Sequence, residues 1–131
     1  MDHIIPLNST ATESIIVDKK HSAKILGSGE VEVLATPMMI AIMEAASLYT
    51  AQVYLPSDWT TVGTKVEVEH LRPTPLGQRV TATATLVKQE GRILQFQVVA
   101  HDKQGLIGQG THHRFIINIE RFMAKLKPPK G

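Results

Sequence analysis

The chain has 131 residues, no cysteine and a formal net charge of +2 at pH 7. This length predicts one domain over residues 1–131, large enough to bury a core without metals or disulfides. The lack of cysteine excludes thiol catalysis and suits a reducing compartment, so we expect a cytoplasmic protein.

Membrane and nucleic-acid partners are not expected. No apolar run approaches the roughly 18 residues of a membrane span, and the first residues lack the basic start and apolar core of a secretory signal. The tail from Arg121 to Gly131 concentrates cations. Because few aromatic residues are interleaved with them, this charge does not indicate nucleic-acid binding.

The chain begins with weakly patterned residues. We expect residues 1–13, like residues 127–131, to be flexible. The β-branched run at 14–20 predicts a strand, and residues 21–30, which contain Gly27 and Gly29, predict a loop.

A helix is predicted from Thr36 to about Val53. Thr36 suits the N-cap and Pro37 the first helical position. Residues 38–43 are apolar all round the helical wheel, which is typical of an enclosed helix. Glu44 would then have poor access to water, which makes it a candidate functional residue, an ion-pair partner, or a side chain on one exposed strip.

Period-two patterns follow the helix. Val66, Val68 and His70 share one face of the first strand, and further strands are predicted over residues 80–86, 94–100 and 106–119. Gly108 and Gly110 would permit close approach of a backbone or ligand, and Arg114 lies on their face. The pattern predicts an α+β fold, in which one helix packs on a five-stranded antiparallel sheet. Since one helix cannot cover such a sheet, we expect a homodimer or a dimer of dimers.

Three residues together suggest catalysis: Thr36, Glu44 and His70. A hydroxyl, a carboxylate and an imidazole can activate water or a nucleophile for acyl transfer. Thr36 and Glu44 would lie about 12 Å apart along the helix axis, a gap that a ligand could bridge. The alternatives are a simple cap, an ion-pair partner and a satisfied core histidine.

Several short segments occur in an order and spacing that match a known family. They are residues 36–39, 43–45, 62–64, 69–70, 73–77, 90–92, 100–102 and 107–112, followed by Arg114 and residues 120–122. With them the chain resembles the hotdog-fold acyl-CoA thioesterases, in the branch typified by fluoroacetyl-CoA thioesterase.

The resemblance implies a dimeric hotdog fold that hydrolyses an acyl-CoA thioester without a cofactor, coenzyme A being part of the substrate. It implies that Thr36, Glu44 and His70 are catalytic. It also implies that Gly63 offers an amide near the thioester and that Arg114 lies on the coenzyme A side. Glu44 could attack the carbonyl or act as general base, and Thr36 could position the thioester, relay a proton or act covalently.

One departure concerns the acyl group. A pocket for a very small fluorinated acyl group would be closed by bulky aromatic residues, whereas residues 27–30 read Gly-Ser-Gly-Glu. We therefore predict a different short or medium acyl group.

Other activities stay open from the sequence. A hydratase or dehydratase of acyl thioesters also needs a histidine and an acid, and a non-enzymatic acyl-CoA-binding protein needs only the pocket. His101, His112 and His113 do not predict a metal site, because His112 and His113 are adjacent in a strand and point to opposite faces.

Overall fold

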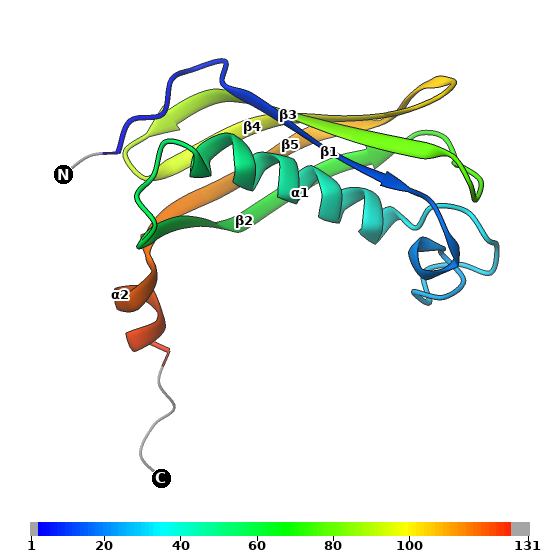
Figure 1. Cartoon of the computed structure of the whole chain (residues 1–131), viewed down its shortest axis with the longest axis horizontal. Coiled ribbons are helices and arrows are strands. Elements are labelled where there is room, and N and C mark those ends of the chain that lie inside the picture. The colour runs from blue at the N-terminus through cyan, green and yellow to red at the C-terminus, as the bar shows by residue number, and fades with distance from the viewer. Residues whose placement is uncertain (1–2, 127–131) are drawn as a thin grey trace, which may run out of the picture.

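The computed structural model describes residues 3–126, and the flexibility predicted for residues 127–131 lies outside this range. One long helix, α1, packs against the inner face of a curved five-stranded sheet (Figure 1). The elements in chain order are β1 (Thr10–Ile16), a 3-10 turn (Lys19–His21), α1 (Thr36–Gln52), β2 (Trp59–His70), β3 (Arg79–Glu90), β4 (Ile93–Asp102), β5 (Gly105–Asn118) and α2 (Ile119–Ala124).

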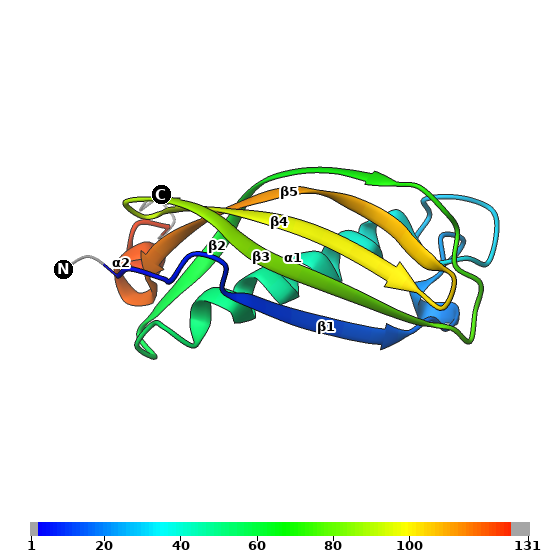
Figure 2. The same ribbon diagram turned by 90° about the horizontal axis from the view of Figure 1, so that it is seen from above.

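The strands lie in the order β1-β3-β4-β5-β2, and all neighbours are antiparallel. β3, β4 and β5 form the predicted meander, while α1 carries the chain from β1 at one edge to β2 at the other (Figure 2). The α+β fold with one helix on an antiparallel sheet is thus confirmed. β2 is an edge strand, because within residues 3–126 it pairs only with β5.

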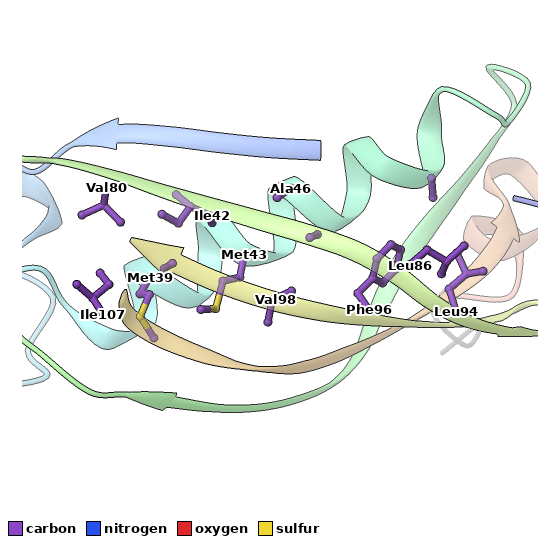
Figure 3. Packing of buried hydrophobic residues seen from close by; sticks show 14 of the residues in the cluster. Met39, Ile42, Met43, Ala46, Val80, Leu86, Leu94, Phe96, Val98 and Ile107 are labelled. Atoms are coloured by element: carbon purple, nitrogen blue, oxygen red, sulfur yellow. The ribbon is translucent and has the colours of Figure 1, made fainter. Parts of the chain in front are cut away.

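The core lies between α1 and the sheet. Met39, Ile42, Met43 and Ala46 of the helix face side chains of β3, β4 and β5, among them Phe96 (Figure 3). Burying such side chains contributes roughly 1.5–3 kcal/mol each, so this layer supplies most of the favourable free energy of folding.

Glycines in β5 bring the layers close together. A Cβ on Gly108 would lie 2.5 Å from Met39 Sδ, and one on Gly110 would overlap the backbone of β2 at Glu67. The predicted close approach is confirmed, and the groups that approach are the helix and the neighbouring strand.

The bounds predicted for the first strand are wrong. The first strand spans Thr10–Ile16 rather than 14–20, because Thr10 to Ile16 pair with residues 79–85 of β3 while Asp18 caps the 3-10 turn that follows. Residues 3–13 are also tied to the rest of the chain. Ile5 is buried, and its backbone amide donates to Gln89 Oε1 at 2.9 Å.

The two helices differ in part from the predictions. α1 begins at Thr36 as predicted, but Ala35 is the N-cap residue, which leaves the Thr36 hydroxyl free for another contact. The helix is not enclosed, since the Glu44 side chain is 41% exposed.

The short helix α2 was not predicted; its signal is Asn118, whose side chain accepts a hydrogen bond from the Arg121 amide at 3.1 Å. None of the helices in residues 3–126 has the length and apolar character needed to span a membrane.

Candidate active site

Thr36 and His70 form a hydrogen-bonded pair. Thr36 opens α1 and His70 ends β2, and Thr36 Oγ1 lies 2.7 Å from His70 Nδ1. Because Ala35 rather than Thr36 occupies the N-cap, this hydroxyl is directed at the imidazole instead of at the helix amides. The distance is typical of an activated hydroxyl and its base.

His70 is held in its neutral state. Burial lowers the pKa of this imidazole from its usual value of 6.5, and the nearby Arg72 backbone opposes the change only in part. Nε2 is buried and makes no hydrogen bond within residues 3–126. At neutral pH the ring can therefore accept a proton from the Thr36 hydroxyl, provided that Nε2 carries the ring hydrogen.

Glu44 lies over Gly63, eight residues further along the helix from Thr36. A Cβ on Gly63 would lie only 2.9 Å from Glu44 Oε2, so a side chain at this position would displace the carboxylate. The sheet register shifts between Gly63 and Lys65, which marks a bulge next to this contact. Such bulges are common beside active sites because they redirect the strand.

Arg114 anchors this second group of residues. Its Nε donates to Thr61 Oγ1 at 2.7 Å, its Nη2 donates to the Thr61 carbonyl at 2.9 Å, and its Nη1 lies 3.9 Å from Glu44 Oε2. The Arg114 side chain is 7% exposed. Burial lowers the pKa of Arg114, the Glu44 carboxylate opposes this, and the guanidinium stays charged at neutral pH.

His112 completes the support of Arg114, a role that the sequence did not predict. His112 Nε2 lies 3.1 Å from Arg114 Nη1, and Nδ1 lies 2.7 Å from the Lys65 carbonyl. An arginine can only donate and a carbonyl can only accept, so His112 is neutral with its hydrogen on Nδ1. Burial lowers the pKa of His112, in keeping with this state.

The residues predicted to be catalytic do not all meet within one chain. Eight helical residues separate Thr36 from Glu44, about 12 Å along the axis. Within residues 3–126 no hydrogen bond or ion pair joins Glu44 to Thr36 or His70. The chain thus presents two half-sites: the first half-site is Thr36 with His70, and the second is Glu44 with Gly63 and Arg114.

No metal centre accompanies these half-sites in the part of the chain that the structure describes. No group of three or more His, Cys, Asp or Glu side chains lies close enough to hold an ion there.

Arg114→Met should destabilise the fold. The change leaves the Thr61 carbonyl and His112 Nε2 without their donor in a buried place, and we expect the free energy of unfolding to fall by about 2–4 kcal/mol. Urea unfolding measures this. The control is Arg79→Met, an exposed arginine at the start of β3, which should cost at most ~0.5 kcal/mol. Equal losses in the two variants would contradict the anchoring role.

The chain is similar to known thioesterases in sequence and in fold. A family model described as fluoroacetyl-CoA-specific thioesterase matches residues 17–120. A fluoroacetyl-CoA thioesterase from Streptantibioticus cattleyicolor is 43% identical over 102 residues, which cover 76% of this chain and 73% of that protein. This chain therefore belongs to the fluoroacetyl-CoA-specific thioesterase family, and the family predicted from the sequence is confirmed.

Solved structures agree with this assignment. The structure of a fluoroacetyl-CoA thioesterase matches with a TM-score of 0.86 at 36% identity, covering 95% of this chain and 98% of that one. A thioesterase superfamily member from Thermus thermophilus matches with a TM-score of 0.86 at 28% identity, covering 94% and 91%. The hotdog fold is confirmed. These relatives are thioesterases, which favours hydrolysis over the hydratase and the non-enzymatic binding protein.

Proposed function

We propose that this protein hydrolyses an acyl-CoA thioester to a free acid and coenzyme A, with Thr36, Glu44 and His70 as catalytic residues. Hydrolysis of thioesters is the activity of its family. The observation that supports these residues most is the 2.7 Å contact between the Thr36 hydroxyl and the neutral imidazole of His70. Gly63 and Arg114 complete the site as substrate-binding residues.

The chemistry assigns the proton transfers to His70. Its Nδ1 takes a proton from the Thr36 hydroxyl or from water as the oxygen approaches the carbonyl carbon. Backbone amides at Gly63 and at the start of α1 stabilise the oxyanion that develops. The C–S bond then breaks and the sulfur of coenzyme A takes the proton. If water is the nucleophile, this step releases the acid; if Thr36 or Glu44 is the nucleophile, the acyl group stays on that side chain until a water molecule attacks it and releases the acid. Glu44 supplies the carboxylate that attacks the carbonyl or deprotonates the attacking water.

We propose that the two half-sites meet across a homodimer. The outer edge of β2 has no strand partner in the described chain. Val66 lies on the face of β2 that turns toward α1, yet its side chain is 37% exposed, which leaves apolar surface for a partner to cover. Antiparallel pairing of two β2 edges around a twofold axis between Val66 and Glu67 would set His70 opposite the partner's Gly63, because 63 and 70 lie equally far from that axis. Glu44 of the partner subunit lies over that glycine.

The remaining parts of the proposal concern the whole molecule. We propose a single domain over residues 1–131, a cytoplasmic location and no cofactor. The mass of the chain is 14.4 kDa, so light scattering at about twice this value would support the dimer, and about four times would indicate a dimer of dimers.

The test of the reaction is hydrolysis of acyl-CoA esters, followed by release of the free thiol and by identification of the acid. We expect one molecule of free coenzyme A for each molecule of carboxylic acid formed. Conversion of an enoyl-CoA to a hydroxyacyl-CoA without thiol release would instead indicate a hydratase. Tight binding of the esters without any turnover would indicate a binding protein.

The activity should depend on pH through His70. Since burial lowers the pKa of His70 from 6.5, the neutral base predominates at neutral pH and is lost only as the pH falls below 6.5. We therefore expect kcat to be level from pH 7 to 8 and to fall on the acid side, with a midpoint below 6.5. A midpoint above that value would contradict the neutral base.

A further inference from the structure

A cavity of about 300 Å³ opens beside the first half-site. Thr36 and His70 form part of its wall, so a group placed in it lies next to the pair that we propose to act on the thioester. The rest of the wall comes from two segments, the loop before α1 and the residues after β2. The loop contributes Ser28, Gly29 and Val31, and the segment after β2 contributes Leu71, Arg72 and Pro73.

The wall is mainly apolar, and none of the lining residues is a phenylalanine, tyrosine or tryptophan. The sequence has no aromatic residue of these types before Tyr49, so nothing bulky on this loop narrows the cavity. Ser28 and Gly29 stand on the loop side, and Val31, which is 61% exposed, adds apolar surface at the mouth.

The one charged residue in the wall is already paired. Arg72 Nη2 donates to Asp102 Oδ1 at 3.0 Å, and the Asp102 side chain is only 2% exposed. Arg72 Nε has no partner but is itself buried. The cavity therefore holds no free positive charge for an acyl group that ends in a carboxylate.

The size of the cavity indicates the length of the acyl group. A water-sized group takes roughly 30 Å³, so a cavity of about 300 Å³ is far more than a two-carbon acyl group needs. A small group would leave most of the apolar wall uncovered, and the hydrophobic effect would contribute little to its binding.

We propose that this cavity is the acyl pocket and that it takes an apolar aliphatic chain of medium length, roughly six to eight carbons. The inference rests on the proposed thioesterase function and specifies its substrate class. Each methylene that the wall covers should raise kcat/KM by about fourfold until the cavity is full.

The test is kcat/KM for acetyl-, fluoroacetyl-, butyryl-, hexanoyl-, octanoyl- and succinyl-CoA, read as free thiol. We expect values that rise from acetyl to hexanoyl or octanoyl, with fluoroacetyl and succinyl near the bottom. A maximum at acetyl, fluoroacetyl or succinyl would overturn the pocket and leave the thioesterase standing. No thiol release from any ester would overturn the function and the pocket together.

Variants locate the effect in the cavity. Ser28→Phe and Val31→Phe each place an aromatic ring in the cavity. Both residues lie on an exposed loop, so the variants should fold normally. Each should lower the ratio of kcat/KM for hexanoyl-CoA to kcat/KM for acetyl-CoA more than tenfold. Leu26→Phe is the matched control, because Leu26 lies on the same loop, is 44% exposed and does not line the cavity. An unchanged ratio in both Ser28→Phe and Val31→Phe would overturn the assignment.

Discussion

His70→Ala is expected to lower kcat for acyl-CoA hydrolysis by about 10²–10⁴-fold, the range in which a positioned acid–base group contributes. The imidazole lies 2.7 Å from the Thr36 hydroxyl, and both residues line the cavity beside this half-site. Alanine leaves no group to take the proton during attack. Steady-state rates with a hexanoyl-CoA substrate and a thiol readout measure the loss.

The change must be separated from unfolding. Thr36 is the one side chain to which His70 is hydrogen-bonded within residues 3–126, so the melting temperature should move by only a few degrees. His101→Ala is the matched control, since His101 is an exposed histidine near the end of β4. Turnover of His70→Ala within a few-fold of the wild type would remove His70 from the mechanism.

Glu44→Gln should have a comparable effect, a loss of about 10²–10⁴-fold in kcat. Glutamine keeps the shape of the side chain over Gly63 but can neither attack the thioester nor take a proton from water. The side chain is 41% exposed and 3.9 Å from Arg114, so the loss of charge should change the free energy of unfolding by at most about 1 kcal/mol.

Glu69→Gln provides the control for Glu44→Gln. Glu69 is an exposed carboxylate on β2 and pairs with Gln109 on the outer face of the sheet, away from α1. Its removal should leave kcat unchanged. If Glu44→Gln were as active as Glu69→Gln, the carboxylate would serve only as a neighbour of Arg114.

Local patterns were enough to predict most of the fold. The Thr36-Pro37 start and the Leu55-Pro56 break bound the helix, and alternation in β3, β4 and β5 predicts the meander. β1 was misplaced because the β-branched run at 14–20 has a high local propensity for strand, whereas the bounds of the true strand are set by its pairing with β3. The sequence left the exposure of Glu44 open, since the helical wheel does not show how much of α1 the sheet covers.

The site was predicted only in part. From their residue types, Thr36, Glu44 and His70 were predicted to share one site; Thr36 and His70 are in contact, although Thr36 does not cap the helix as predicted. His112 was missed, because a histidine in a strand gives no sign of its partner. The signal that could have found it is its position two residues before Arg114, on the same face of β5. The separation of Glu44 from His70 depends on tertiary geometry that sequence spacing does not contain.

In the proposed dimer, each active site takes Thr36 and His70 from one subunit and Glu44 from its partner. This arrangement can be tested by assembling heterodimers from differently tagged His70→Ala and Glu44→Gln chains. One of the two shared sites would then be intact, so the purified heterodimer should have about half the wild-type kcat. In the reciprocal test, a wild-type chain is paired with a chain that carries both changes. Neither shared site is then intact, so this heterodimer should be inactive. An inactive first heterodimer with a half-active second one would show that each chain builds its own complete site and would rule out sites shared between subunits.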